Sequence, residues 1–258
     1  MVFTEWFSLE GKTALVTGAG RGLGQSAALG LAQAGADVIG FGRDLEKLEE
    51  TSHQIERMGR RALPLVTDVG LSDQVRASVS RALKVFGRID ILVNNAAVML
   101  GKASEKTTEA EWDDLIRTNL KGTFLCSQVV GSHMIEAGGG KLINVGSIFG
   151  LTGTTHCLAY ACSKAAIHQM TRSLAVEWAK HGITVNAIVP GYFDTEMPAH
   201  ILSDPHFRKT IFDRMPVRRI GRPEEIRPLV VYLASRASDF MTGQMLCMDG
   251  GYSIALYF

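Results

Sequence analysis

The sequence lacks a hydrophobic run long enough to cross a membrane. No apolar stretch in its 258 residues reaches the roughly 18 residues that a helical span requires. Its first ten residues contain Glu5 and Glu10, whereas a secretory leader has a basic start followed by an apolar core. We therefore expect a cytoplasmic protein with no membrane partner.

An excess of charge of one sign is also missing. The chain has 27 Lys and Arg against 26 Asp and Glu, a formal net charge of +1, and no run of basic residues. Proteins that bind nucleic acid or anionic lipid usually carry a basic patch. We therefore do not expect a nucleic-acid partner.

Cysteine is scarce. The four cysteines have no CxxC spacing and no pattern of histidine partners, and their neighbours are apolar or small: Cys126, Cys157, Cys162 and Cys247. Disulfide frameworks and zinc sites show regular spacing of their ligands. We expect four small buried thiols and no metal site.

What the sequence does contain is a regular alternation of short apolar runs and helical patterns. The length suits a single domain, 1–258. Strands are predicted at 12–16, 37–41, 62–67, 89–94, 141–145, 183–189 and 244–248, and helices at 25–34, 45–58, 72–86, from 108, at 158–178 and from 223. Strands apolar on both faces belong in a parallel sheet covered by helices on both sides. This predicts an α/β, Rossmann-like, doubly wound fold with ligands beyond the carboxyl ends of the strands.

A glycine loop follows the first predicted strand and opens the first helix. Glycines stand at positions 18, 20, 22 and 24, and Leu23 occupies the place of the third glycine in the common G-x-G-x-x-G fingerprint. Small residues still let backbone N–H groups and a helix N-terminus approach a pyrophosphate. In a strand–loop–helix context this loop predicts dinucleotide binding.

The end of the second strand decides which dinucleotide is preferred. An acidic residue there holds a ribose 2′-hydroxyl, and a basic residue holds a 2′-phosphate. If the strand ends at Gly42 and Arg43, then Arg43 and Arg21 can bind the phosphate, which favours NADP. If it runs one residue further, Asp44 takes the ribose and NAD is preferred.

The segment from Ser147 to Lys164 carries the predicted chemistry. On a helix, Tyr160 and Lys164 lie on one face with Cβ atoms about 5–6 Å apart. The ammonium is expected to lower the pKa of the phenol from its usual value of about 10, as a general acid/base requires. Ser147 would donate a hydrogen bond to the same substrate oxygen. A YxxxK pattern alone is common by chance, so the prediction depends on the motifs upstream.

The segment at about 191–222 interrupts the alternation and is predicted to be a substrate lid. Its modest basic excess suits an anionic substrate, although a solvated lid explains it equally well. His156 lies between Ser147 and Tyr160 and could contact the substrate or be an ordinary loop histidine.

Several motifs occur together in one order and spacing over nearly the whole chain. They are TGxxxGxG from Thr17, the run Asn94-Asn95-Ala96-Ala97, Asn119, Ser147, YxxxK from Tyr160, and Pro190-Gly191. In these motifs the chain resembles the short-chain dehydrogenase/reductase family. Its one departure is Ala97, where the family usually has glycine, and a single methyl group there leaves the chemistry intact. The resemblance implies hydride transfer between a nicotinamide cofactor and a secondary alcohol or ketone.

The resemblance also implies the functional residues. A catalytic tetrad is implied for Asn119, Ser147, Tyr160 and Lys164, with Asn119 anchoring a water that links Lys164 to solvent. The implied cofactor contacts are Gly18, Gly20, Arg21, Gly22, Leu23, Gly24, Arg43, Asp68, Val69, Asn95, Ala96, Ala97, Tyr160, Lys164, Pro190, Gly191, Thr195 and also Ile188. A homotetramer, built through the helices that start near Thr108 and Leu158, is implied in the same way.

The substrate is less defined. Residues 7–12 and 177–192 look like the corresponding segments of sugar-acid and polyol dehydrogenases, and they are also similar to those of 3-oxoacyl carrier-protein reductases. A general carbonyl reductase is a further alternative. A regulator that binds a dinucleotide without turnover would keep the glycine loop but damage the tetrad, and all four tetrad residues are present.

Overall fold

Seven parallel strands form one sheet at the centre of the protein. The computed structural model describes residues 2–196 and 204–255. The strand order is β3-β2-β1-β4-β5-β6-β7, all strands pairing in parallel. The strands are β1 (Thr13–Thr17), β2 (Asp37–Gly42), β3 (Ala62–Val66), β4 (Ile91–Asn94), β5 (Gly140–Val145), β6 (Ile183–Pro190) and β7 (Met245–Met248). The predicted Rossmann-like sheet is confirmed.

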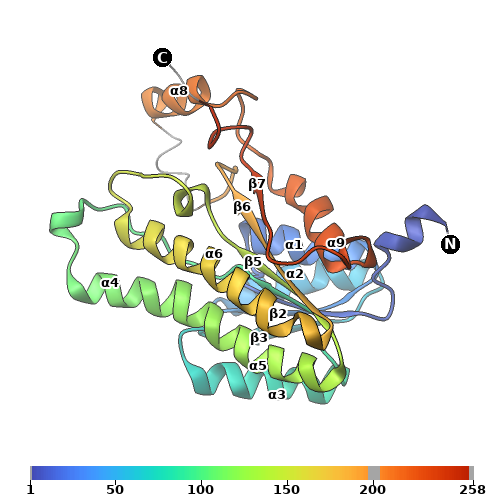
Figure 1. Cartoon of the computed structure of the whole chain (residues 1–258). Coiled ribbons are helices and arrows are strands. Elements are labelled where there is room, and N and C mark those ends of the chain that lie inside the picture. Colours follow the sequence, from blue (N-terminus) through green and yellow to red (C-terminus); the bar gives the residue numbers. More distant parts are fainter. Residues whose placement is uncertain (1, 197–203, 256–258) are drawn as a thin grey trace.

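Helices cover both faces of this sheet (Figure 1). They are α1 (Gly22–Gln33), α2 (Leu45–Arg57), α3 (Ser72–Phe86), α4 (Glu109–Ile116), α5 (Gly122–Ala137), α6 (Leu158–Trp178), α8 (Pro205–Arg214) and α9 (Arg227–Ala234). Neighbouring strand residues pack into opposite layers: Ala14 and Val16 contact the core under α1, α2 and α9, whereas Leu15 contacts the core under α3, α5 and α6. Both faces of β1 are therefore dry, which explains why its sequence is apolar throughout.

The predicted element boundaries hold to within a few residues, and the differences are local. Residues 117–121 form a π-helical turn between α4 and α5. The predicted lid contains the helix α8, and its residues 197–203 lie outside the described part of the chain. A 3-10 turn, η6 (Pro223–Ile226), leads into α9, so the helix predicted from 223 begins with this turn.

The expectation of four buried thiols is half wrong. Cys126 and Cys157 are buried, but Cys162 and Cys247 are exposed. Cys162 lies on the outward side of α6, and Cys247 lies on β7, the edge strand of the sheet. Sequence neighbours do not reveal which side of an element faces outward. Within residues 2–196 and 204–255, no helix is long and apolar enough to span a bilayer.

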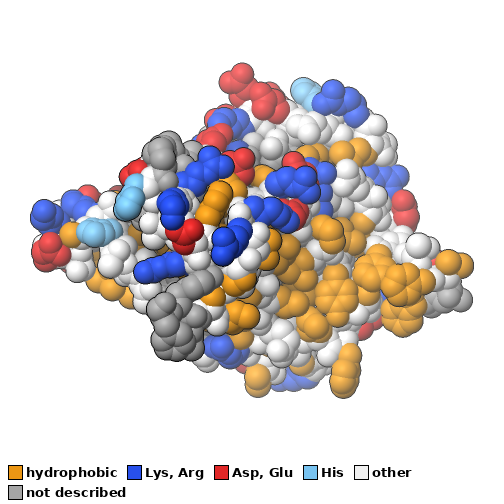
Figure 2. Space-filling model, turned by 90° about the horizontal axis from the view of Figure 1, so that it is seen from above, with side chains coloured by type: hydrophobic (Ala, Val, Ile, Leu, Met, Phe, Trp, Pro, Cys, Tyr) orange, Lys and Arg blue, Asp and Glu red, His pale blue; other side chains and the backbone are white. Residues whose placement is uncertain are grey.

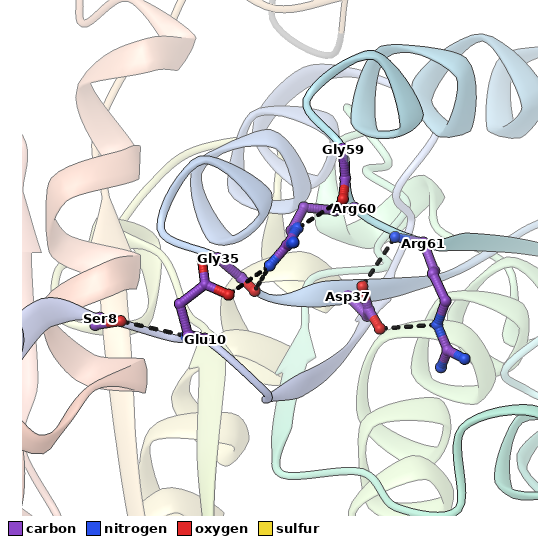
Figure 3. Close-up of polar contacts among 7 residues, drawn as sticks. All are labelled: Ser8, Glu10, Gly35, Asp37, Gly59, Arg60 and Arg61. Atoms are coloured by element: carbon purple, nitrogen blue, oxygen red, sulfur yellow. Dashed lines mark hydrogen bonds and ion pairs between the residues drawn. The ribbon is translucent and has the colours of Figure 1, made fainter.

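Ion pairs hold the amino ends of the first three strands (Figure 3). Arg60 Nη1 donates to Glu10 Oε2 at 2.6 Å and to the Gly35 carbonyl at 2.9 Å. The backbone and side chain of Arg61 both donate to the Asp37 carboxylate, at 2.8 and 2.9 Å. These contacts fix how β1, β2 and β3 begin, at the end of the sheet opposite the predicted ligand site.

A buried polar network crosses the centre of the sheet. Asn94 Nδ2 donates to Asn144 Oδ1 at 3.0 Å and to Ser127 Oγ at 2.9 Å, and Asn144 Nδ2 donates to Thr171 Oγ1 at 2.9 Å. The Asn144 side chain is fully buried. It therefore joins β4, β5 and α6 through hydrogen bonds that water cannot replace.

We expect Asn144→Ala to lower the free energy of unfolding by about 1–3 kcal/mol, because it leaves buried polar partners unsatisfied. Urea unfolding followed by circular dichroism measures this loss. The matched control is Ser132→Ala, which removes an exposed hydrogen bond to the Gln128 carbonyl and should change stability by less than about 0.5 kcal/mol. Equal stabilities of the two variants would show that the network contributes nothing.

Candidate active site

A large cleft opens at the carboxyl ends of the strands. It has a volume of about 1350 Å³ and is lined by residues that follow β1, β2, β3, β4, β5 and β6. Strand order reverses at β1, which has β2 on one side and β4 on the other, and such a switch point is where doubly wound folds bind ligands. Figure 2 shows the molecule from above, with Lys and Arg side chains gathered on one side and hydrophobic side chains on the other.

The glycine loop is packed too closely to admit larger side chains. Gly18 has φ +67° and Gly22 has φ +56°, conformations that favour glycine. A Cβ at Gly18 would lie 2.8 Å from Asn95 Nδ2, and one at Gly24 would lie 2.1 Å from the Gly18 carbonyl oxygen. The loop therefore rests against the end of β4 with its backbone facing the cleft.

The start of α1 fits a pyrophosphate. Arg21 is the N-cap residue, and its side chain does not cap the helix. The N–H groups of the first turn, together with the positive end of the helix dipole, are then available to an anion in the cleft. The glycine loop and this uncapped helix are the features that a dinucleotide requires.

The end of β2 favours Arg43 over Asp44 as the residue that selects the dinucleotide. The strand ends at Gly42, and Asp44 is the N-cap of α2, accepting a hydrogen bond from the Lys47 backbone N–H at 3.3 Å. The Asp44 carboxylate is thus used by the helix. Arg43 is exposed and lines the cleft together with Arg21, so the exit has the basic character that suits a 2′-phosphate.

Three groups of the predicted tetrad meet in the cleft. Tyr160 and Lys164 lie on α6, and Ser147 follows β5; all three line the cavity. Lys164 is only 2% exposed, and its Nζ donates to the Val145 carbonyl at 2.7 Å. The same Nζ lies 5.6 Å from the centroid of the Tyr160 ring. The phenol, the ammonium and the hydroxyl therefore converge, as the sequence predicts.

The expected fall in the pKa of Tyr160 is wrong for the chain alone. Burial raises the pKa of the phenol to about 12, while a hydrogen bond with Ser147 acts in the opposite direction and is weaker. Burial also lowers the pKa of the Lys164 ammonium from 10.5 to about 8. Both shifts have one cause, because a low-dielectric wall disfavours each charged form.

Asn119 does not reach the cleft. It is fully buried in the π-helical turn, where its Oδ1 accepts from the Val98 N–H at 2.8 Å and its Nδ2 donates to the Val98 carbonyl at 2.9 Å. A longer bond of 3.3 Å joins Nδ2 to Ser163 Oγ on α6. These are the contacts of a structural amide, and the water link from Asn119 to Lys164 stays a prediction.

Most of the predicted cofactor residues line the cleft, and three predicted residues lie behind its wall: Gly24, Asn119 and Ile188. Those that line it are Gly18, Gly20, Arg21, Gly22, Leu23, Arg43, Asp68, Val69, Asn95, Ala96, Ala97, Tyr160, Lys164, Pro190, Gly191 and Thr195. Asn95 also ties the strands together, because its Nδ2 donates to the Thr17 carbonyl at 3.0 Å.

Several cleft residues were not predicted from the sequence. Phe149 and Tyr192 form an aromatic wall beside Tyr160, with Phe149 edge-on to each of the two tyrosines at 6.3 and 6.2 Å. Basic and acidic side chains also line the cleft: Lys47, Lys102, Lys106 and Glu196. Lys47 could have been found, because it stands one turn after the predicted strand exit; the others had no signal.

His156 lines the cleft and has an unusual backbone. Its φ is +60°, and its carbonyl accepts a hydrogen bond from the Lys102 N–H at 2.6 Å. A non-glycine residue in this conformation is held there by its surroundings. The structure thus places His156 on the wall of the cleft, and both alternatives for this residue stay predictions.

Comparisons with known proteins agree with this geometry. A family model described as enoyl-(acyl carrier protein) reductase matches residues 18–253. The chain is 42% identical over 247 residues to 2-dehydro-3-deoxy-D-gluconate 5-dehydrogenase of Escherichia coli K12, covering 95% of this chain and 97% of that protein. It is 37% identical to the 3-oxoacyl-[acyl-carrier-protein] reductase of Thermotoga maritima, covering 95% and 99% of the two chains.

A solved structure is similar over nearly its whole length. It is a gluconate 5-dehydrogenase from Burkholderia cenocepacia J2315 in complex with NADP and tartrate, with a TM-score of 0.95 and 37% identity. The match covers 98% of this chain and 99% of that one. The two chains therefore share the same fold over nearly their whole length.

The buried ammonium gives a testable effect of pH on stability. Because the native pKa of Lys164 is depressed, the unfolded chain binds more protons than the native chain between about pH 8 and 10.5. Stability from this group is thus present above pH 10.5 and lost as the pH falls to 8, with a slope of up to about 1.4 kcal/mol per pH unit. We expect Lys164→Met to remove this slope in urea unfolding. Wild-type and variant curves that stay parallel across the window would contradict the assignment.

Proposed function

The chain belongs to the short-chain dehydrogenase/reductase family, and we propose that it transfers a hydride between NADP(H) and a secondary alcohol or ketone of a sugar acid. The observation that carries this proposal is the convergence of Ser147, Tyr160 and Lys164 in the cleft that also holds the glycine loop. The Escherichia coli relative and the Burkholderia cenocepacia structure support the substrate class by their names.

Three observations support NADP as the cofactor. Arg21 in the glycine loop and Arg43 after β2 both line the cleft, and one oxygen of the Asp44 carboxylate is used by the cap of α2. The Burkholderia cenocepacia enzyme was crystallised with NADP. NAD stays the alternative, and activity measured with each cofactor in turn decides between them.

In the proposed mechanism the substrate exchanges a hydride with the nicotinamide and a proton with Tyr160. The bound nicotinamide supplies the hydride acceptor or donor. Tyr160 takes the proton of the substrate hydroxyl during oxidation and returns it during reduction. Ser147 donates a hydrogen bond to the same oxygen, and the charge of Lys164 favours the phenolate that forms when Tyr160 gives up its proton. The oxygen that changes between hydroxyl and carbonyl is thus held by two hydroxyl groups from different segments.

We expect Tyr160→Phe to lower kcat by about 10²–10⁴-fold while cofactor still binds, because the variant keeps the ring and loses only the proton donor. Steady-state kinetics and a fluorescence titration with NADPH measure the two properties separately. Tyr232→Phe, in α9, is the matched control and should leave both unchanged. Full kcat in Tyr160→Phe would remove Tyr160 from the mechanism.

Cations at the far end of the cleft support an anionic substrate. Lys102 Nζ bonds both carboxylate oxygens of Glu111 at 2.8 Å, so its charge is balanced. Lys106 also lines the cleft and has no ion pair within the described residues. By contrast, no basic residue of the described lid lines the cleft. Lys106 is therefore better placed than the lid to receive a substrate carboxylate.

Replacing Lys106 distinguishes the two substrate classes. We expect Lys106→Met to raise KM for gluconate about tenfold, equal to the loss of one charge-assisted hydrogen bond, with little change in kcat. KM for a neutral β-ketoacyl thioester should not change. Lys209→Met, an exposed lysine paired with Asp213 on α8, is the control. The sugar-acid proposal fails if gluconate is not turned over while the thioester is a good substrate.

The acyl alternative has its own structural support. The aromatic wall of Phe149 and Tyr192 offers an apolar surface beside Tyr160, which suits an acyl chain or the substrate of a general carbonyl reductase. The Thermotoga maritima relative supports the same class by its name. A dinucleotide-binding regulator would bind NADPH and turn over none of these substrates.

A homotetramer, a single domain over 1–258 and a cytoplasmic location complete the proposal. Support for assembly comes from apolar side chains on the outer faces of α5 and α6, where Phe124 is 45% exposed, Leu158 47% and Val176 82%. Isolated exposed apolar residues are normal, but these lie on α6 and on α5, which continues the helix that starts near Thr108 through residues 117–121, and so they suit a subunit contact at the helices named by the family resemblance.

A further inference from the structure

One carboxylate occupies the basic edge of the cleft. Glu196 Oε2 lies 2.6 Å from Arg21 Nη1, and Glu196 Oε1 lies 3.2 Å from Lys47 Nζ. The three residues come from separate segments: the glycine loop, the first turn of α2, and the residues that follow β6. All three line the same cleft. Glu196 therefore links the segment after β6 to both the glycine loop and α2.

Arg21 and Lys47 are, with Arg43, the cations of this edge that can bind a phosphate on the adenine ribose. Lys47 lies against the glycine loop, since a Cβ added to Gly20 would be 3.0 Å from Lys47 Cβ. Arg21 and Lys47 line the same cleft as Arg43, the residue that follows β2 and that selects between the two dinucleotides. Arg43 makes no ion pair among the described residues, so Glu196 acts on the other two cations.

A carboxylate and a phosphate monoester use the same donors. Both accept charge-assisted hydrogen bonds from a guanidinium and an ammonium. The two Glu196 contacts engage Nη1 of Arg21 and Nζ of Lys47, and these contacts also hold the pKa of Glu196 below its usual value. A 2′-phosphate that binds at this edge must displace Glu196 from Arg21 and Lys47. A 2′-hydroxyl needs no ion pair with these cations and leaves the Glu196 contacts in place.

We propose that Glu196 is a specificity-determining residue that competes with the 2′-phosphate of NADP(H) for Arg21 and Lys47, and so narrows the preference for NADP(H) over NAD(H). The inference rests on the proposed dinucleotide cofactor.

The test compares two affinities in one variant. Fluorescence titrations with NADPH and NADH at one fixed ionic strength give the dissociation constants of wild type and Glu196→Gln, without any need for turnover. In Glu196→Gln we expect the NADPH dissociation constant to fall about 3- to 20-fold, because the phosphate no longer competes with two exposed ion pairs. The NADH dissociation constant should change less than twofold. Glutamine keeps the size of the side chain and removes its charge.

Two controls isolate the contact from the change in net charge. Glu224→Gln removes the same charge from an exposed residue of η6 that does not line the cleft, and it should leave both constants unchanged. Lys47→Met combined with Glu196→Gln should reduce the gain in NADPH affinity, because one of the contested cations is gone.

The outcomes separate this inference from the proposed function. If Glu196→Gln lowers the NADPH and NADH dissociation constants equally, or lowers neither, Glu196 does not compete with the 2′-phosphate. If the variant binds both nucleotides more weakly, the competition is also overturned, and Glu196 instead stabilises the bound cofactor. A wild-type chain that binds neither NADPH nor NADH would overturn the proposed cofactor itself. Gain of NADPH binding in Glu196→Gln alone supports the competition even if wild type binds only NADH.

Discussion

The hydrogen bond from Lys164 to the Val145 carbonyl is the contact on which the catalytic end of the cleft depends. An ammonium that is 2% exposed cannot stay charged without a partner, and the end of β5 provides one. This bond fixes α6 against β5. Tyr160 lies one helical turn before Lys164, and Ser147 lies two residues after Val145, so both hydroxyl groups are positioned by the same contact. The burial that makes the bond necessary also sets the pKa values of the phenol and the ammonium.

At the cofactor end of the cleft, close backbone packing positions the site, as the Lys164 side chain does at the catalytic end. Close packing of Gly18 and Gly24 against each other and against Asn95 holds the glycine loop to the end of β4, and α1 then starts without a side-chain cap. Charge is added around this frame by residues from distant segments, including Glu196. The frame accounts for binding a dinucleotide, and the added charges account for which dinucleotide is preferred.

The sequence predicts the fold well because each strand is buried on both faces and each helix has its own pattern, so local residues suffice. It also predicts the meeting of Ser147, Tyr160 and Lys164, since helical spacing and strand order place them. It fails on the pKa of Tyr160, because burial depends on packing between α6, Phe149 and the sheet. It leaves Asp44 open because a helix cap depends on backbone geometry. Contacts such as Glu196 with Arg21 join residues 175 positions apart, and no local pattern predicts them.

The central claim is that hydride and proton leave one substrate carbinol within this cleft. Gluconate deuterated at each of its secondary carbinol carbons, C2 to C5, and incubated with NADP⁺ tests it directly, with the reduced cofactor analysed by NMR. The account predicts deuterium on C4 of the nicotinamide, on one face only. Reduced cofactor without the label, or with the label on both faces, would contradict it.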